Sequence, residues 1–562
     1  MNSEIKVSIT LSRLSILFCA GLVGLAGCKL GGYSQTRANR ILAAEKEGLN
    51  ARTLGATRFA FDDLGGLNTD TLQTNAFPWK VVATAMAMEF ASRNGVAPSP
   101  QMIPRIFQQY GWITPSGVDN WPDKQAPTFD KPVGIVSGEI RRSIPKIRLE
   151  VANMGCAACH AGMSYDANGM PTGRIWLGST NSSRFFDGYT RDILAGLRYV
   201  RDRQDELLVT IPKLFPNVHA DEMATIRKYV LPQIVERLDS AAAGNDILIP
   251  FKHGGAGLTN GIAALKLRLD AKPSLVGKHE HGYASIPDLY GRRLRSSVLY
   301  DGLYALRNDA RFVQRHEGDF TRADHGRLAS IVAFFIVPSM GIKPTESEKQ
   351  AARISDILVW LLDYQPQPFP GPVDRDKAAM GSQLYEKQCA TCHGSYSSGI
   401  DKPRLVSYPN RLVPPDQIKS DPERWGAITD DMIRVIGRTP VAKKVNAANA
   451  RGYVAPILSG VWTSAPYMHN GSVPTLWHLM RPESRPRAFL VGGHKLDLVR
   501  VGVDGEPDQQ GVYRYPAGYQ PWSTPVMFDT SDRGLSNSGH EDEFNRLSEA
   551  EKDALIEFLK VL

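Results

Sequence analysis

Four of the six cysteines in this 562-residue chain stand in two copies of one short pattern. The copies are Cys156-Ala-Ala-Cys159-His160 and Cys389-Ala-Thr-Cys392-His393. C-x-x-C-H attaches a c-type haem, because two thiols one helical turn apart can each form a thioether with the same porphyrin, and the adjacent histidine becomes the proximal iron ligand. One chance match in a chain of this composition has a probability of about 0.001. The sequence therefore predicts two covalently bound c-type haems, with His160 and His393 as iron ligands.

Three other uses of paired cysteines compete with this interpretation. They are a disulfide within each pair, a thioredoxin-like redox site, and one Cys₄ zinc site shared by both pairs. None of them requires a histidine directly after both pairs. The two remaining cysteines, Cys19 and Cys28, lie near the N-terminus. Haem attachment therefore explains the motifs best.

The N-terminal 27 residues are typical of a secretory signal. Two basic residues precede an apolar run from Leu14 to Ala26, which is too short for a membrane anchor helix. The run leads into Leu25-Ala26-Gly27-Cys28, which resembles a bacterial lipobox, and Lys29 favours sorting to the outer membrane by the same resemblance. We expect a lipoprotein signal peptide over residues 1–27 and lipidation of Cys28, on the periplasmic side of the outer membrane. The alternative is an ordinary signal peptide and a periplasmic protein.

Composition and charge exclude several classes of function. Hydrophobic residues make up 42% and charged residues 22% of the chain, as in a soluble globular protein. No later apolar run reaches the length of about 18 residues that a membrane-spanning helix needs, so the lipid anchor is the only membrane contact expected. The net charge of +8 comes from scattered residues and forms no nucleic-acid patch. Attraction to an acidic redox partner or an anionic substrate group stays open.

The length predicts two or three domains. The Pro-rich segment 365–372 is the best boundary, because prolines end regular elements. We expect a tether and N-terminal strap over residues 28–74, polar and loop-like, then an N-terminal haem domain over 75–365 and a C-terminal cytochrome c domain over 373–562. The expected fold class is mainly α, with two cytochrome c-like haem domains, long loops and little β-structure.

Local patterns predict several elements in the first half of the chain. An amphipathic helix is expected over 79–92, a short strand over 146–152, and a helix over 221–243 that is kinked at Pro232. The glycine-rich segment 254–261 lacks the Lys-Ser/Thr of a phosphate-binding loop, so we interpret it as a cluster of turns.

Two capping boxes mark helix starts. Thr345-x-x-Glu348 predicts a helix before the Pro-rich boundary, and Ser548-x-x-Glu551 predicts the last helix of the chain. The apolar face of the first of these helices consists of Ile354, Ile357, Leu358 and Leu361. A further helix over 376–388 leads into the second motif. A helix before C-x-x-C-H and a terminal helix packed against it is the arrangement of a cytochrome c.

The sixth ligand of each iron decides what the protein does. Two strong ligands make an electron-transfer centre, whereas an open position can bind O₂ or peroxide. The candidates for distal ligands are the other histidines and three methionines, Met468, Met480 and Met527.

The stretch 453–476, with its Ala465-Pro-Tyr-Met-His469-Asn-Gly core, resembles the C-terminal signature of the bacterial dihaem cytochrome c peroxidase superfamily. Other segments resemble the branch that contains the rubber oxygenases and the fatty-acid diol synthases. These segments are Arg485-Pro-x-x-Phe489, Gly492, Asn537-Ser-Gly-His540, Gly155–His160, Thr180-Asn181 and Ser285-Ile-Pro-x-Leu289.

The resemblance implies roles for particular residues. His540 corresponds to the distal ligand of the second haem, and the first haem keeps its distal side available for O₂. His469 has a place at or beside the haem edge. The branch often has a tryptophan near the active haem, after the segment Ile286-Pro287, where this chain offers Tyr290 and Tyr300. We take His160, Tyr300 and His469 as candidate catalytic residues; core packing is the alternative for Tyr300, and an ordinary structural role for His469.

Three functions follow. The first is an exported haem oxidoreductase, dioxygenase-like or cytochrome c peroxidase-like, that acts on an apolar unsaturated substrate such as a fatty acid or polyisoprene. A peroxidase would receive electrons from a small cytochrome or copper carrier. The second is a pure electron carrier with both haems six-coordinate; the third is a non-catalytic lipoprotein. The nearly three hundred residues around the first motif favour a substrate cavity. The sequence leaves open whether calcium is bound as well.

Overall fold

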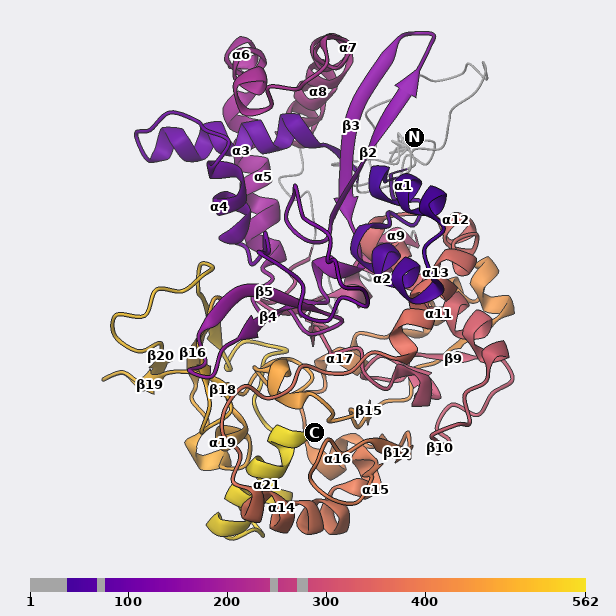
Figure 1. Cartoon of the computed structure of the whole chain (residues 1–562), viewed down its shortest axis with the longest axis vertical. Coiled ribbons are helices and arrows are strands. Elements are labelled where there is room, and N and C mark those ends of the chain that lie inside the picture. The colour runs from indigo at the N-terminus through magenta and orange to yellow at the C-terminus, as the bar shows by residue number, and fades with distance from the viewer. Residues whose placement is uncertain (1–37, 68–75, 243–250, 270–280) are drawn as a thin grey trace, which may run out of the picture.

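The computed structural model describes residues 38–67, 76–242, 251–269 and 281–562 (Figure 1). The predicted signal segment and Cys28 lie outside these ranges. Helices account for 41% and strands for 15% of the structure, so helix predominates but the expectation of little β-structure is wrong. The long connections pair with one another in eight small sheets among the described residues, because buried backbone groups need hydrogen-bond partners. No helix in the described ranges is long and apolar enough to cross a bilayer.

Most of the longer helices lie before the Pro-rich segment, and short helical turns are frequent after it. Before residue 365 the helices are α1 (Asn39–Glu47), α2 (Ala51–Phe61), α3 (Trp79–Arg93), α4 (Met102–Gln108), α5 (Phe186–Val200), α6 (Gln204–Leu214), α7 (Ala220–Thr225), α8 (Leu231–Ala242), α9 (Gly261–Arg268), α11 (Arg322–Met340), α12 (Pro344–Glu348) and α13 (Ala351–Leu362). After it they are α14 (Arg375–Gln388), α15 (Ala390–His393), α16 (Pro415–Ile418), α17 (Glu423–Gly426), α18 (Asp430–Ile436), α19 (Leu476–Leu479), α20 (Glu541–Phe544) and α21 (Glu549–Val561).

Strands are short apart from one hairpin. In the first half they are β1 (Phe77–Pro78), β2 (Ile135–Arg142), β3 (Ile147–Met154), β4 (Ala161–Tyr165), β5 (Pro171–Leu177), β6 (Leu258–Thr259), β7 (Ala284–Ser285), β8 (Ser297–Val298), β9 (Tyr304–Leu306) and β10 (Arg315–His316). In the second half they are β11 (Ser395–Tyr396), β12 (Leu405–Tyr408), β13 (Leu412–Val413), β14 (Val445–Ala447), β15 (Tyr453–Val454), β16 (Ala488–Val491), β17 (Leu496–Asp497), β18 (Gly502–Val503), β19 (Glu506–Pro507), β20 (Val512–Arg514) and β21 (Val526–Asp529).

The N-terminal strap is helical where it is described, so the prediction of a loop-like segment is wrong there. Asn50 begins α2, because its side-chain oxygen accepts hydrogen bonds from the next backbone amides. The helix is buried against α13, and Gly55 makes this close approach possible, since a Cβ there would lie 2.3 Å from the carbonyl oxygen of Asp356. Arg58 joins the two helices through ion pairs with Asp62 and Asp356.

Two predicted elements of the first half are confirmed, with changes. Helix α3 has the expected bounds but is buried on nearly all sides rather than amphipathic, because it packs against α5 and α6. Strand β3 forms as expected and pairs antiparallel with β2, a partner that the sequence did not reveal. The predicted helix over 221–243 is split into α7 and α8 by one wide helical turn over Ile226–Val230, just before Pro232. Proline lacks the N–H that a regular helix needs at that point.

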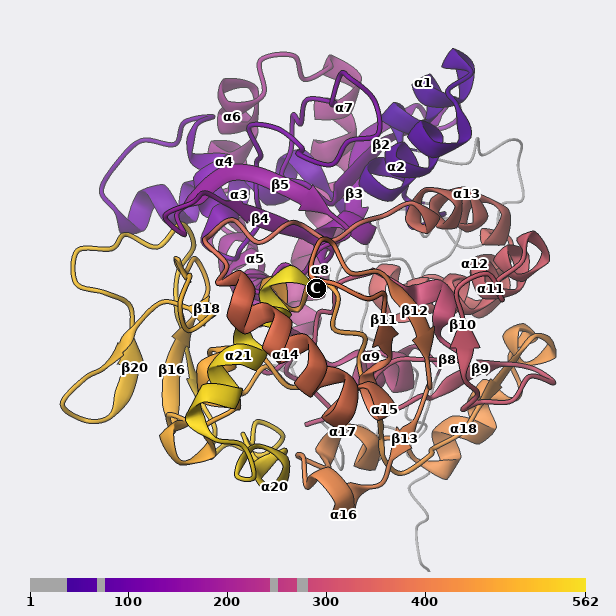
Figure 2. The ribbon, with the colours of Figure 1, turned by 60° about the horizontal axis from the view of Figure 1, so that its bottom comes forward.

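The helices that flank the Pro-rich segment also differ in part from expectation. Thr345 does not cap a helix, because α12 already begins at Pro344 and a separate helix, α13, begins at Ala351. The Ser548–Glu551 capping box is confirmed at the start of α21. Helices α14 and α21 lie side by side, as in a cytochrome c (Figure 2). Gly381 permits this contact, since a Cβ there would lie 2.0 Å from a backbone oxygen of α21.

The two halves of the chain are joined by shared sheets as well as by the Pro-rich segment. Strand β10 pairs with β12, and β9 pairs with β14, so each of these sheets contains strands from both sides of residue 365. The main hydrophobic core likewise includes buried residues from both halves. In Figure 1, α3–α8 with β2 and β3 lie in the upper part, and α14, α15, α16 and α21 lie in the lower part.

Candidate functional site

Both C-x-x-C-H motifs form one tight helical turn. The backbone N–H of His160 donates to the carbonyl of Cys156 at 3.1 Å, and that of His393 donates to the carbonyl of Cys389 at 2.9 Å. Such a turn places the first cysteine and the histidine close together, with the second cysteine between them. All four thiols are free, so neither pair is a disulfide.

The environment of the thiols disfavours the other two uses of paired cysteines. Burial raises the pKa of Cys156 and of Cys389 to about 12, and that of Cys159 to about 11. A thioredoxin-like site needs a thiol whose pKa is lowered, and zinc binds thiolates. The described part of the chain also has no group of three or more His, Cys, Asp or Glu side chains that could hold a metal ion, which applies to zinc and to calcium alike.

Each motif histidine is fixed by the carbonyl oxygen of a proline. Nδ1 of His160 donates to the oxygen of Pro287 at 3.0 Å, and Nδ1 of His393 donates to the oxygen of Pro456 at 2.8 Å. A carbonyl can only accept, so Nδ1 carries the proton and Nε2 keeps its lone pair. Burial lowers the pKa of His160 to about 4 and also lowers that of His393, which keeps both rings neutral. This is the tautomer that a metal-ligating histidine needs.

Residues that follow the first motif hold its backbone in place. The carbonyls of Ala158, Cys159 and His160 accept hydrogen bonds from Arg184 Nε, Asn181 N and Gly178 N, at 2.8 to 3.1 Å. Arg184 is fully buried and its guanidinium lies 3.6 Å above the ring of Trp112. The Thr180-Asn181 segment singled out in the sequence therefore supports the first motif directly.

A cavity of about 980 Å³ reaches both motifs. His160 and His393 both border it, together with the four motif cysteines. Helices of the first half supply apolar side chains to its wall, among them Phe186, Ile193, Ile262, Leu265, Val332, Phe335 and Leu358. Helices of the second half supply Leu384, Leu476, Leu479, Leu555 and Leu559. Both motif histidines thus face one largely apolar space.

A second histidine ring faces His393. The ring centroids of His393 and His540 are 6.3 Å apart and their planes differ by 32°. Two imidazoles bound to one metal through bonds of about 2 Å have centroids about 6 Å apart, so this spacing fits an iron between them. The chain turns sharply to present His540, whose φ is 66°, after Gly539 with a φ of 125°. A Cβ at Gly539 would lie 2.6 Å from Ser420 Oγ, so only glycine fits there.

His160 has no such partner among the described residues, where no other histidine ring contacts it. His253 borders the same cavity, but its Nδ1 accepts a hydrogen bond from the backbone N–H of Asn260 at 3.2 Å. In the neutral ring the proton is then on Nε2, which leaves no lone pair there for an iron. His279 lies outside the described residues.

The three methionines named as ligand candidates differ in position. Met527 is 45% exposed and lies on β21, away from the cavity wall. Met480 is fully buried and borders the cavity, and Met468 borders it next to Gly539. The facing rings of His393 and His540 make His540 the better candidate for the second motif.

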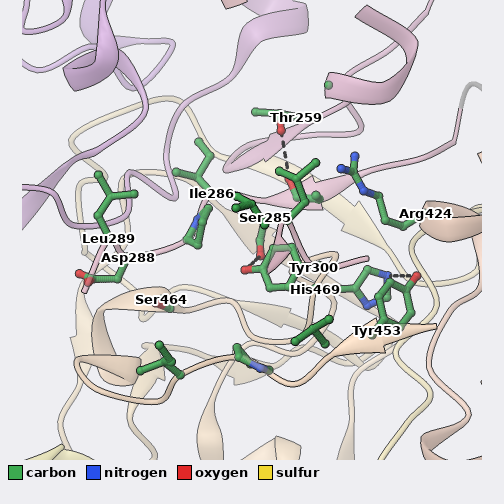
Figure 3. Close-up of a pocket in the computed structure, with 18 of the residues that line it drawn as sticks. Thr259, Ser285, Ile286, Asp288, Leu289, Tyr300, Arg424, Tyr453, Ser464 and His469 are labelled. Carbon is green, nitrogen blue, oxygen red and sulfur yellow. Dashed lines mark hydrogen bonds between the residues drawn. The ribbon is translucent and has the colours of Figure 1, made fainter. Parts of the chain in front are cut away.

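Tyr300 and His469 lie together in the cavity wall (Figure 3). The hydroxyl of Tyr300 is 3.0 Å from Ser285 Oγ, and its ring centroid is 6.5 Å from that of His469. Tyr453 donates its hydroxyl proton to the carbonyl oxygen of Asp421 at 2.5 Å, so it can only accept from His469 Nε2, 2.9 Å away. His469 Nδ1 therefore carries a lone pair, and burial lowers the pKa of His469 to about 3.

A buried ion pair supports this wall from behind. Arg424 Nε lies 2.8 Å from Asp301 Oδ2, and Arg424 also donates to the carbonyl of Gly282 at 3.0 Å. Both side chains are almost fully buried, and Asp301 directly follows Tyr300. Tyr300 thus borders the cavity with a partly buried side chain.

Several residues that position the site were missed by sequence reasoning. Pro287 and Pro456 fix the two histidines, and Arg292, Arg295 and Asp288 border the cavity between them. The recurrence of an apolar residue followed by proline, in Ile286-Pro287 and Ala455-Pro456, was the signal available for the first two. The run Arg292-Arg293-Leu294-Arg295 gave no such signal, because charged residues usually lie at the surface.

The residues present fit a c-type haem at both motifs. Each motif offers two unpaired thiols, a neutral histidine with a free Nε2, and a cavity beside it. His540 places a second imidazole ring opposite that of His393.

Comparison with known proteins gives partial matches. The uncharacterized protein y4iM of Sinorhizobium fredii (strain NBRC 101917 / NGR234) is 29% identical over 204 residues, which are 31% of this chain and 43% of that protein. The uncharacterized protein y4iJ of the same strain is 35% identical over 255 residues, which are 35% of this chain and 40% of that protein. The matches thus span about two-fifths of either curated relative. Residues 452–490, which include Pro456 and His469, match the family model described as RoxA-like, cytochrome c-like, and this match relates the chain to the RoxA-like c-type cytochromes.

Proposed function

We propose that the protein is an exported dihaem c-type cytochrome and an oxidoreductase of the rubber oxygenase and diol synthase-like branch. A haem at His160 activates O₂ or peroxide, and a haem at His393 and His540 takes part in electron transfer. One observation carries this proposal. Both motif histidines border one cavity, but in the described residues only His393 has a histidine ring opposite it.

The first site is suited to an apolar substrate. A haem bound there supplies an iron that can bind and activate the oxidant. The chain supplies the walls: apolar side chains from α5, α9, α11 and α13 line the cavity and exclude water from it. An unsaturated fatty acid or a polyisoprene segment matches these walls in polarity.

Tyr300 and His469 are the polar groups that can assist at this wall. His469 is neutral, and its Nδ1 has no partner among the described residues, so it can accept a hydrogen bond or a proton from a bound group. Tyr453 and the carbonyl of Asp421 fix its orientation. The Tyr300 hydroxyl, held by Ser285, can donate or accept near the same place. These are the roles we assign to the two candidate catalytic residues.

Aromatic residues occupy the space near the second motif. Tyr385 is 5.7 Å from Tyr396 and 5.3 Å from Phe558, ring centre to ring centre, and Tyr290 borders the cavity. We propose that these aromatic side chains assist electron transfer at the second haem. A peroxidase-like reaction would draw electrons from a small cytochrome or a copper carrier.

Export follows from the N-terminal segment, which resembles a lipoprotein signal. We propose that Cys28 is lipidated and anchors the protein to the periplasmic side of the outer membrane. Expression of the full chain and of Cys28→Ser tests this. The wild type should fractionate with membranes and Cys28→Ser with the soluble periplasm, with equal haem content in both. A wild-type protein that stays in the cytoplasm would contradict export.

One set of spectra tests the proposed chemistry. The purified ferric and ferrous protein should contain one low-spin iron and one iron that binds CO or O₂. His253→Ala and His279→Ala are matched controls, and neither should change the low-spin signal. Two low-spin irons that bind no ligand would favour the alternative of a pure electron carrier. If the wild type has two low-spin irons and His253→Ala or His279→Ala loses one of the two low-spin signals, that histidine is the distal ligand of the first haem.

The substrate class is tested with the ferrous protein. Oleate, a polyisoprene emulsion, and peroxide with a reduced small cytochrome are each added, and O₂ uptake and products are measured. Product from an apolar alkene supports the dioxygenase-like reaction, and oxidation of the small cytochrome supports the peroxidase-like reaction. No turnover with any of them would leave electron transfer as the better account.

A further inference from the structure

Two arginines stand in the cavity wall close to the residue that fixes His160. Arg292 and Arg295 follow Pro287 on the same connection, and both border the cavity. Arg295 is only 9% exposed; its Nε donates to the carbonyl of Ser297 and its Nη2 to that of Leu299, both at 2.9 Å. Arg292 donates through Nη2 to the carbonyl of Asp288, and its Nε is buried without any hydrogen-bond partner. Part of each guanidinium is therefore left unused.

Neither arginine has an anion to balance its charge. Over the ranges that the structure describes, no carboxylate oxygen lies within the 4.0 Å of an ion pair from either guanidinium. Arg58, Arg424 and Arg481 are buried and form ion pairs. Arg184 is buried without an ion pair, but its guanidinium lies 3.6 Å over the ring of Trp112. A buried charge without a partner is strongly unfavourable, so a site of this kind is built for an anion.

The nearest acidic residue does not serve this purpose. Asp288 accepts from the hydroxyl of Tyr364 at 2.7 Å and from the backbone N–H of Tyr290 at 2.8 Å. Burial raises its pKa to about 6, which reduces its negative charge near neutral pH. Burial, and to a smaller extent the nearby charge of Arg295, lowers the pKa of Arg292 to about 10. The positive charges of Arg292 and Arg295 are thus opposed at most by the partial negative charge of Asp288.

We infer that Arg292 and Arg295 form a carboxylate-binding site in the cavity wall beside the first motif. A guanidinium offers two parallel N–H groups that match the two oxygens of a carboxylate. Two sources of that group fit the same chemistry: the carboxylates of a porphyrin bound at His160, or the head group of a long-chain fatty acid whose tail lies along the apolar wall. The porphyrin as the source rests on the proposed function, whereas the fatty acid as the source requires only the apolar cavity.

The test uses the full-length holoprotein and four variants. Arg292→Gln and Arg295→Gln remove one guanidinium each. Arg293→Gln is the matched control, because Arg293 carries the same charge but donates to the carbonyl of Leu362 and does not border the cavity. Arg292→Lys keeps the charge but cannot form two parallel hydrogen bonds. Covalent haem content is measured first for every variant.

Two readouts distinguish the two sources. The porphyrin carboxylate bending bands in the resonance Raman spectrum should shift in Arg292→Gln or Arg295→Gln, and not in Arg293→Gln, if the haem supplies the group. The affinity for oleic acid relative to oleyl alcohol should be about tenfold or more in the wild type and close to onefold in those variants, if a fatty acid supplies it. Either result supports the site and identifies its occupant.

The proposal is overturned if both Gln variants keep normal haem content, an unshifted Raman band and the wild-type ratio of acid to alcohol affinity. It is also overturned if Arg293→Gln changes these readouts as much as the other two. Should the Gln variants fail to mature, Arg292→Lys and an Arg295→Lys variant take their place in the same comparison. A protein without covalent haem contradicts the proposed function instead, and calorimetry with the two lipids then still decides whether the carboxylate site exists.

Discussion

The histidines of the two C-x-x-C-H motifs make the same hydrogen bond through Nδ1, but different residues lie opposite their rings. In both, a proline carbonyl accepts the Nδ1 proton of the histidine, at 3.0 Å for His160 and 2.8 Å for His393. Beyond that ring the similarity ends. His393 faces the imidazole of His540, whereas His160 faces apolar cavity wall in the described structure.

In the proposed function, this difference separates the roles of the two sites. The proximal support serves any haem, since it fixes one tautomer and one ring orientation. The opposite side decides whether the iron is saturated, and in the second site it depends on a left-handed residue after a glycine that tolerates no side chain. Under the proposed function, one local turn of the backbone distinguishes the electron-transfer site from the open site.

The largest expected effect comes from removing one motif at a time. Cys156→Ser with Cys159→Ser, and separately Cys389→Ser with Cys392→Ser, should each reduce covalent haem from two per chain to one. The first double variant should retain only low-spin iron, and the second should retain the ligand-binding iron, because the two distal sides differ. Pyridine haemochrome, iron content and CO binding measure this. Identical spectra for the two double variants would contradict the comparison.

Removing the distal ligand should make the two sites alike. His540→Ala is expected to convert the second iron from low-spin to high-spin and to let it bind CO, while the first site is unchanged. His494→Ala is the control, because His494 is also buried but does not border the cavity. Electron paramagnetic resonance of the ferric protein gives the answer. A low-spin signal that survives in His540→Ala would assign the ligand elsewhere, with Met468 as the next candidate.

The sequence predicted the local elements around the second motif better than their tertiary contacts. The C-x-x-C-H patterns, α14, α21 and its capping box follow from local rules, and the structure has these elements where expected. The ring of His540 opposite His393 agrees with the role that the resemblance implied, which stays a prediction until the ligand is measured.

The remainder depends on contacts between distant residues, which no local pattern encodes. One such contact joins His160 and Pro287, which are 127 positions apart in the sequence. Helix α2 was missed because its apolar residues cover nearly all sides of a buried helix and show no periodicity. The prediction that a helix begins at Thr345 was wrong because Pro344 is itself a favourable first helical residue, so α12 begins one position earlier.

Filling the open side should impair only the first site. Gly261 borders the cavity at the start of α9, and a Cβ there meets no atom within 4 Å. Gly261→Phe is therefore expected to occupy cavity space without a backbone clash and to raise the KM for an apolar substrate about tenfold, roughly the loss of one or two buried methylene contacts. Gly326→Phe, at an exposed and equally open position on α11, is the control. Equal KM values would place the substrate elsewhere.

A smaller change is expected at Tyr300. Tyr300→Phe keeps the ring and removes the hydroxyl that lies 3.0 Å from Ser285 Oγ, so turnover at the first site should fall about three- to tenfold while the second haem keeps its spectrum. Tyr290→Phe, which also borders the cavity, is the comparison. If Tyr300→Phe turns over at the wild-type rate, its ring serves packing alone and the assignment of a chemical role fails.

The smallest expected effect concerns how two buried histidines, His494 and His478, make the free energy of unfolding depend on pH. His494 stacks on Tyr165, the last residue of the strand that leaves the first motif, and its Nδ1 is buried without a partner. His478, on α19, instead bonds Thr475 Oγ1 at 2.8 Å. Burial lowers the pKa of each to about 4, below the value of about 6.5 in the unfolded chain.

Between pH 6.5 and 4 the unfolded chain thus binds a proton at each histidine that the folded protein does not. The free energy of unfolding should fall as the pH falls through this window, by about 1.4 kcal/mol per pH unit for each group. His494→Phe should remove one such contribution at little cost near pH 7, since no hydrogen bond of its ring is lost. His478→Phe should remove the other but lower stability at every pH by about 1 kcal/mol. Guanidinium unfolding at several pH values measures both slopes, and an unchanged slope in His494→Phe would mean that this ring is already protonated or accessible in the folded protein.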